Sequence, residues 1–229
     1  MHAIRTSQLA GLLMALLSSL NATAALTTID FEGLPAMTYF PGSPIPESAK
    51  LSSQLLTSYG VTFSSADPYV AVVALGFGHA TSGVNGIGAS NGYGILTYDK
   101  AFPISFEFFN PVNPTTKAVT DFVSLRGDNA GSNETVFLRA YDTLGNIIAE
   151  TSAVDNGGPT LSIAVQGIHS VRFFGTRDSG GVAVDDLTFG QLTIPSVPEP
   201  SSTVLALAGI VLLATFRKSR DLEGPKSGT

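Results

Sequence analysis

The chain has 229 residues, a formal net charge of −6 and no cysteine. This length suits one domain with accessory segments, and the lack of cysteine excludes disulfide scaffolds, thiolate zinc sites and cysteine nucleophiles. Charged residues make up 13% and apolar residues 44%, which excludes an acidic disordered chain. An acidic balance without a basic stripe argues against nucleic acid as a partner.

The first 24 residues have the pattern of a cleaved signal peptide. Arg5 precedes an apolar run over residues 9–20, and Ala22-Thr23-Ala24 forms a small-residue cleavage site. We therefore expect export of the chain and a mature protein that begins at Ala25. An uncleaved anchor helix is the alternative.

Residues 25–192 are predicted to form an all-β ectodomain. Residues 25–196 hold 7 Lys and Arg against 15 Asp and Glu, a net charge of −8. Short runs rich in Val, Ile, Phe, Thr and Tyr are separated by Gly, Pro, Asn and Asp clusters, which is typical of an antiparallel β-sandwich. The predicted strands are 27–31, 61–65, 69–74, 94–98, 102–109, 119–126, 134–142, 146–152, 160–165, 168–174 and 182–189.

Local patterns add detail to this β-sandwich. Leu51, Leu55 and Tyr59 have helical spacing, and Gly60 would end that short helix. The glycine-rich residues 80–94 are predicted to be a loop. Residues 136–141 alternate between two faces, and residues 141–146 read as a hairpin turn in which Gly145 takes a positive φ.

Four acidic residues are candidates for a calcium site, because calcium prefers carboxylate and carbonyl oxygens. Asp30 and Glu32 are two residues apart on a predicted strand and would project to the same face. Asp185 has the parity of Leu187 and is expected to point inward, where an unpaired carboxylate is costly. A calcium ion held by these residues and Asp186 would offset that cost. Hydrogen bonds from backbone amides are the alternative, and the oxygen-rich loop 128–134 is a lesser candidate for calcium.

No catalytic residues are predicted, and we expect a non-enzymatic protein. His79 and His169 are expected at the surface or in turns, and the G-x-S-x-G pattern of residues 88–92 lacks the strand–turn–helix context of a serine hydrolase. A glycoside hydrolase that uses two acids is the alternative function, with Glu32, Glu107, Glu134 and Asp185 as the available carboxylates. Tyr93, set among glycines, is the candidate for stacking on a sugar ring.

The C-terminal region has three parts in a fixed order. A Pro-rich linker over 193–202 contains Val197-Pro198-Glu199-Pro200; an apolar helix and a basic cluster, Arg217, Lys218 and Arg220, are predicted within 203–220; and a polar tail covers 221–229. This order resembles the PEP-CTERM sorting signal of Gram-negative bacteria. The resemblance implies recognition by an exosortase, a membrane cysteine transpeptidase, and transient retention in the inner membrane. The processed protein would reach the cell surface or the extracellular matrix.

The polar tail departs from that family, which usually stops soon after the basic residues. A permanent bitopic membrane protein is therefore kept as the alternative. Arginine and lysine directly after an apolar segment hold a C-terminus in the cytoplasm in either case.

The ectodomain carries a second resemblance, spread over 27–190. IDFEGLP (29–35), QLLTSYGVTFS (54–64), DFVSLRGDNA (121–130) and VAVDDLTF (182–189) resemble the exported domain common among PEP-CTERM proteins, which is similar to jelly-roll carbohydrate-binding modules. The resemblance implies a structural or carbohydrate-binding component, with exopolysaccharide as a candidate partner. In such modules a structural calcium often joins the first and last strands, which implies roles for Glu32 and Asp185.

Overall fold

The structure is a computed structural model, and it describes residues 25–38, 44–65, 69–74, 80–90, 96–97, 103–127, 134–155, 157–176 and 184–195. The predicted signal peptide, the sorting motif, the basic cluster and Tyr93 lie outside these residues. Within the described part of the chain, no helix is long and apolar enough to cross a membrane.

Alternation of side chains along the strands decides which face of each sheet is buried. In β10 (Glu134–Tyr141), Val136, Leu138 and Ala140 are at most 1% exposed, whereas Phe137 and the other residues between them are half-buried. A period of two places these sets on opposite faces of the strand. The two faces predicted for this strand are confirmed.

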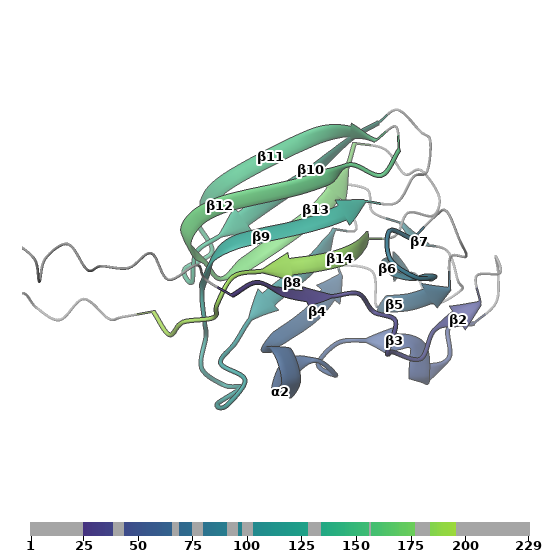
Figure 1. The fold of residues 1–229 in the computed structure, drawn as a ribbon, viewed down its shortest axis with the longest axis horizontal. Coiled ribbons are helices and arrows are strands. Elements are labelled where there is room, and N and C mark those ends of the chain that lie inside the picture. Colours follow the sequence, from purple (N-terminus) through teal and green to yellow (C-terminus); the bar gives the residue numbers. More distant parts are fainter. Residues whose placement is uncertain are drawn as a thin grey trace, which may run out of the picture. The chain divides into compact units, whose positions relative to one another are not determined.

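Two sheets pack face to face as a β-sandwich (Figure 1). The larger sheet has the order β12-β9-β14-β6-β5-β2, and β1, β3 and β7 pair with β14, β5 and β6. Its strands are β1 (Thr27–Ile29), β2 (Met37–Thr38), β3 (Lys50–Leu51), β5 (Tyr69–Ala74), β6 (Asn85–Ser90), β7 (Leu96–Thr97), β9 (Thr120–Gly127), β12 (Thr160–Ile168) and β14 (Val184–Phe189).

The smaller sheet has the order β11-β10-β13-β8-β4 and is antiparallel throughout. Its strands are β4 (Val61–Ser65), β8 (Ile104–Phe108), β10, β11 (Ile147–Asp155) and β13 (Ser170–Gly175). The turn between β10 and β11 contains Gly145 at φ +86°, as predicted.

Aromatic rings join the two sheets in the core. Phe108 of β8 and Phe189 of β14 have ring centroids 5.2 Å apart, and Phe63 of β4 contacts Phe31, just after β1, edge to face at 6.0 Å. Such ring pairs add to the stabilisation from burial. Ile87 of the larger sheet and Leu138 of the smaller one are fully buried in the same core. The predicted all-β sandwich is therefore confirmed.

Three strands were missed by the sequence prediction: the two-residue strands β2 and β3, and β6. Residues 80–94 were expected to be a loop, but Asn85–Ser90 forms β6, and all six of its residues are buried. Gly86 and Gly88 pair with Val73 and Ala71 of β5, whose side chains lie in a second small core with Met37, Ile45 and Ala49. These two glycines of β6 therefore lie beside the small core formed on β5.

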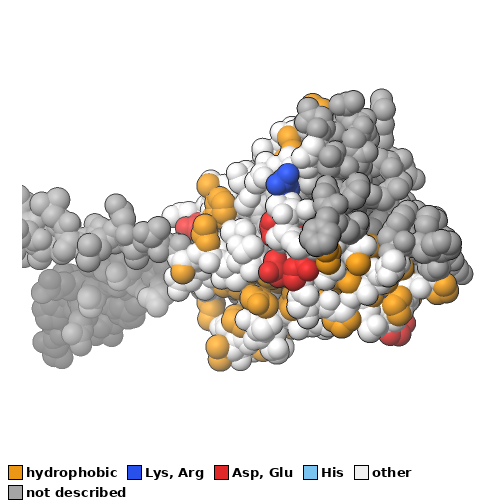
Figure 2. All heavy atoms as spheres, turned by 45° about the vertical axis from the view of Figure 1, so that its right-hand side comes forward, with side chains coloured by type: hydrophobic (Ala, Val, Ile, Leu, Met, Phe, Trp, Pro, Cys, Tyr) orange, Lys and Arg blue, Asp and Glu red, His pale blue; other side chains and the backbone are white. Residues whose placement is uncertain are grey.

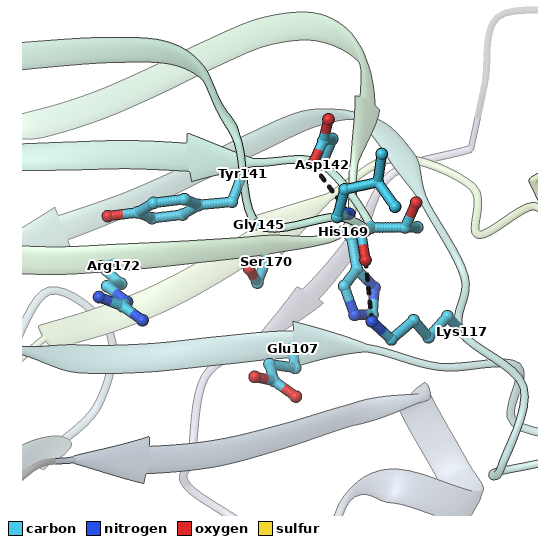
Figure 3. A pocket seen from close by; sticks show the side chains of 10 residues that line it. Glu107, Lys117, Tyr141, Asp142, Gly145, His169, Ser170 and Arg172 are labelled. Atoms are coloured by element: carbon cyan, nitrogen blue, oxygen red, sulfur yellow. Dashed lines mark hydrogen bonds between the residues drawn. The ribbon is translucent and has the colours of Figure 1, made fainter.

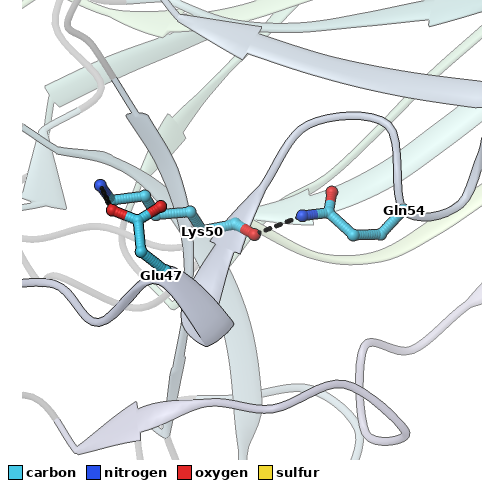
Figure 4. Close-up of polar contacts among 3 residues, drawn as sticks. All are labelled: Glu47, Lys50 and Gln54. Atoms are coloured by element: carbon cyan, nitrogen blue, oxygen red, sulfur yellow. Dashed lines mark hydrogen bonds and ion pairs between the residues drawn. The ribbon is translucent and has the colours of Figure 1, made fainter.

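The helix prediction was only partly correct. α2 (Leu56–Tyr59) is a single turn that ends at Gly60, while Leu51 lies in β3. Gln54 accounts for the late start, because its side chain accepts from Ser52 N and donates to Lys50 O, 2.6 and 2.7 Å away (Figure 4). Local bonds of this kind compete with the helix. Lys50 also pairs with Glu47 and lies 3.7 Å from the ring centre of Tyr69.

Gly60→Ala should destabilise the domain strongly. Gly60 has φ +71°, and a Cβ there would lie 2.3 Å from the backbone oxygen of Phe109. The left-handed backbone costs a non-glycine residue about 1–2 kcal/mol, and displacing the backbone adds about 1–3 kcal/mol. Urea unfolding measures the loss. Gly145→Ala is the matched control, since it has φ +86° but open space around its Cβ. Equal losses in the two variants would contradict the proposed clash.

Candidate functional site

The first candidate site lies where β14 changes its neighbour. β14 pairs with β6 at Val184 and with β1 from Leu187 to Phe189. Between these points Asp186 has φ +51°, and the pairing with β9 shifts register between Asp185 and Thr188. Such a bulge interrupts the ladder and leaves backbone groups without strand partners.

The carboxylate of Asp185 fills the gap at this bulge. Its Oδ2 accepts hydrogen bonds from the backbone amides of Thr81 and Ser82, at 2.8 and 2.9 Å, and its Oδ1 accepts from Asp186 N at 2.7 Å. Ser82 Oγ donates to Asp186 Oδ1 at 2.7 Å. Asp185 is only 3% exposed, so the prediction that it points inward is confirmed.

Glu32 holds the other half of the same loop. Its Oε1 accepts from the backbone amides of Val84 and Asn85, at 2.8 and 2.6 Å, and Asn85 Nδ2 donates to Phe31 O. Gly83 lies between the two carboxylates with φ +54°, and a Cβ there would be 2.2 Å from Glu32 Cδ. We name Glu32, Asp185 and Asp186 with the loop 81–85 the carboxylate junction.

Burial raises the pKa of Asp185 above its ordinary value, and the adjacent charge of Asp186 acts in the same direction. The amides of Ser82, Asp186 and Thr81 oppose this rise by stabilising the ionised form. Figure 2 shows acidic side chains (red) gathered at one place on the face that it presents.

Asp30 does not join this junction, and the prediction that it shares a face with Glu32 was wrong. β1 ends at Ile29, and Phe31 has φ +59°, so the chain turns between the two acids. Asp30 is exposed, and its Oδ1 accepts from Glu32 N at 3.2 Å. An aspartate that caps its own turn in this way is a common local motif.

Two arrangements were expected for these acids: a calcium ion, or hydrogen bonds from backbone amides. The junction contains hydrogen bonds from backbone amides. Its carboxylate oxygens suit a hard cation, but both oxygens of Asp185 and one of Glu32 already accept amide hydrogen bonds. Among the described residues, no three His, Asp or Glu side chains form a group that could hold a metal. As arranged, the residues do not fit a calcium ion, and calcium binding stays a prediction.

Asp185→Ala should lower the free energy of unfolding by about 2–4 kcal/mol, because three part-buried amides lose a charged acceptor. Asp30→Ala, the control, should change it by about 0.5 kcal/mol. Urea unfolding in EDTA and in calcium measures both variants and the wild type. A wild-type midpoint of urea unfolding that falls in EDTA relative to calcium would show calcium binding. An Asp185→Ala loss no larger than that of Asp30→Ala would contradict the role of the junction.

The second candidate site is a hollow of about 360 Å³ on the outer side of the smaller sheet. It is formed where β10 ends, β13 begins and β8 ends, beside the β10–β11 turn (Figure 3). Its lining is Glu107, Lys117, Tyr141, Asp142, Thr143, Leu144, Gly145, His169, Ser170 and Arg172. Most of this lining is polar or charged, which suits a hydrophilic ligand.

Tyr141 and Arg172 form one wall of the hollow. The guanidinium carbon of Arg172 lies 5.0 Å from the centre of the Tyr141 ring, within the range of a cation–π contact. Ser170 of β13 pairs with Tyr141 of β10 on one side and with Glu107 of β8 on the other. Glu107 and Tyr141 are therefore on the two strands that flank β13. Lys117 Nζ donates to Thr143 O at 2.9 Å and closes the far side.

His169 supports the hollow from below. It was expected at the surface or in a turn; it does lie in the β12–β13 turn, but it is only 5% exposed. Its Nδ1–H donates to Ala118 O at 3.0 Å, and its backbone amide donates to Tyr141 O at 2.8 Å. These bonds fix the positions of the strand ends that carry Tyr141 and Ser170.

Asp142 is committed to the turn. Its carboxylate accepts from the side chain and the backbone amide of Asn146 and from Leu144 N. The Asn146 side chain is the main cause of a pKa below the ordinary value for this carboxyl, and the backbone amides act in the same direction.

A line of aromatic and arginine side chains continues from the hollow along β10 and β13. Phe137 and Phe174 are stacked with ring centroids 5.2 Å apart, and Arg139 lies 4.9 Å from the ring centre of Phe174. Arg139 also pairs with Glu150 of β11. On this face Phe137 is half-buried and Phe174 is only 7% exposed, and the guanidinium group of Arg139 lies over the Phe174 ring.

The sequence placed Tyr141 on one of two alternating faces of β10 but did not identify it as a site residue. The signal was present in the alternation of β10, yet the pairing that places Arg172 beside it depends on strands 30 residues apart. Of the candidate acids, Glu107 lines the hollow, whereas Glu32 and Asp185 lie in the junction. The side chain of Glu134 lies outside the described residues.

Comparison with known proteins decides the role of the C-terminal segment. Residues 196–220 match the model of the PEP-CTERM protein-sorting motif. The chain carries a PEP-CTERM protein-sorting motif. The resemblance seen in the sequence is confirmed, and the protein is exported. No curated protein matches the sequence.

Solved structures resemble the fold at low identity. The K2 cleaved adhesin domain of Lys-gingipain is 12% identical with a TM-score of 0.40, and the match covers 73% of this chain and 98% of that one. The CBM22-1–GH10 modules of Clostridium thermocellum xylanase 10B, complexed with xylohexaose, are 12% identical with a TM-score of 0.38, over 71% and 30% of the chains. A xylan-binding CBM22 domain is 12% identical with a TM-score of 0.35, over 66% and 99%.

Proposed function

We propose that this exported protein is a non-catalytic component of the cell surface or extracellular matrix that binds carbohydrate. The carbohydrate lies in the hollow beside Tyr141 and along the outer face of the smaller sheet. An exosortase processes the chain near Pro198-Glu199-Pro200 while the apolar segment holds it in the inner membrane.

The wall formed by Tyr141 and Arg172 is the observation that carries the binding proposal. The apolar face of a sugar ring packs well on an aromatic side chain that has a polar tip. Guanidinium and carboxylate groups such as those of Arg172 and Glu107 can each hydrogen-bond two neighbouring hydroxyls. The hollow combines these groups, and its volume of about 360 Å³ lies within the range of small-molecule sites.

The state of the acids supports binding rather than hydrolysis. A glycoside hydrolase needs one carboxyl that stays protonated as general acid and a second carboxylate opposite it. Asp142, one of the two acids that line the hollow, has a lowered pKa and is held by the turn. Glu32 and Asp185, two of the acids considered for catalysis, support a loop instead.

Tyr141→Ala and Arg172→Ala should each weaken carbohydrate binding at least about tenfold, which corresponds to about 1.4 kcal/mol. Isothermal titration calorimetry of the exported protein against the exopolysaccharide of the producing cell and against xylan measures the affinity. Asp30→Ala, in the exposed turn after β1 of the larger sheet, is the control and should bind as the wild type does. Unchanged affinity in both site variants, or release of free sugar by the wild type, would contradict the proposal.

Deletion of the exosortase should cause the full-length chain to accumulate in the membrane fraction. The reason is that the apolar segment over 203–216, followed by basic residues, stays in the bilayer until the chain is cut. Immunoblots with an epitope on the tail 221–229 measure processing. A tail epitope that stays on the surface-exposed protein in wild-type cells would instead assign a permanent anchor.

A further inference from the structure

Exposed hydrophobic side chains gather at one end of the sandwich. Among the described residues, seven large hydrophobic side chains are exposed, and all but Val154 lie at the end that contains the β10–β11 turn: Leu26, Tyr59, Val112, Leu144, Ile147 and Ile194. Figure 2 shows hydrophobic side chains (orange) along the left-hand end of the described part. We call these six residues the apolar end.

Specific contacts show that these residues share one end. Thr193, next to Ile194, bridges to Val119, and Lys117 Nζ donates to Thr143 O, beside Leu144. Phe109 N donates to Gly60 O, next to Tyr59, and Thr27, next to Leu26, pairs with Phe189. The loop of Val112 runs between Phe109 and Lys117, which pair with each other.

Two of these side chains stand at the tips of similarly built loops. Val112 is 92% exposed and Leu144 is 84% exposed. The backbone amide of Val112 donates to Asn110 Oδ1, and that of Leu144 donates to Asp142 Oδ1, both at 2.9 Å. Each tip therefore presents an apolar side chain on a loop whose amide already has a partner. Satisfied amides reduce the cost of entering a less polar medium.

We infer that the apolar end is a lipid-contacting surface that rests on the bilayer while the precursor awaits processing. The first and last described segments, purple and yellow-green in Figure 1, both leave from this end, because β1 begins where β14 ends. Eight residues, 195–202, join Ile194 to Thr203, where the apolar segment begins. The nine Cα-to-Cα steps, at about 3.5 Å each, span no more than roughly 32 Å.

This inference rests on the proposed retention in the membrane and adds an orientation to it. A few apolar tips bind a bilayer weakly, and stable attachment takes a second signal. The tether supplies that signal by raising the effective concentration of the tips at the surface. Once the chain is cut near Pro198-Glu199-Pro200, the tips alone no longer hold the domain, so the same contact that positions the precursor allows the product to leave.

The chain contains no tryptophan, so a single introduced tryptophan reports on its own surroundings. The exported chain through Thr229 carrying Val112→Trp or Leu144→Trp is reconstituted in phosphatidylethanolamine–phosphatidylglycerol vesicles. Val154→Trp, half exposed on β11 away from the apolar end, is the control. Vesicle flotation measures attachment, and quenching by brominated lipid measures contact with acyl chains.

Both tip variants should float with the vesicles and show at least twofold stronger quenching than Val154→Trp. In cells, Val112→Asp with Leu144→Asp should slow processing several-fold without lowering the melting temperature. If the protein floats but quenching is equal at all three positions, lipid contact by the apolar end is wrong and retention of the precursor in the membrane stands. If the protein does not float, both proposals are wrong. If the emission of the tip tryptophan shifts in the absence of vesicles and the protein sediments as a dimer, the apolar end binds a second copy of the chain instead of lipid.

Discussion

The buried carboxylate of Asp185 allows β14 to pair with three other strands. β14 pairs along one edge with β9 and divides the other edge between β6 and β1. Division of an edge leaves amides unpaired, and buried unpaired amides are costly. Asp185 and Glu32 accept hydrogen bonds from four amides of the loop 81–85, so the interruption in the sheet is satisfied by side chains in place of a strand.

The junction and the hollow use charged groups in different ways. In the junction, backbone amides of the protein itself bind both oxygens of Asp185 and one of Glu32, which supports a structural role. In the hollow Arg172, Glu107 and the Tyr141 ring face outward beside one another. A hydrophilic ligand with an apolar face matches that surface, and the rigid support from His169 reduces the ordering cost of binding.

Much of the fold followed from local patterns. β4 and β5 have the predicted bounds, 61–65 and 69–74, because alternation and turn residues act over a few positions. β6 could not be predicted, since its glycines are explained only by the small core that covers β5. The sequence identified Glu32 and Asp185 correctly as neighbours, but it also grouped Asp30 with them. Asp30 lies outside the carboxylate junction because the backbone turns at Phe31, whose positive φ no pattern in the sequence indicates.

The position of β14 in the chain also couples folding to export. This strand lies inside the larger sheet, between β9 and β6, yet it is the last strand described before the sorting motif. A chain that crosses the membrane from its N-terminus delivers β14 after every other described strand. Until then the larger sheet lacks its middle, and Asp185 is not there to hold the loop 81–85. The larger sheet can therefore be completed only once the chain up to Phe189, just before the sorting motif at 196–220, is present.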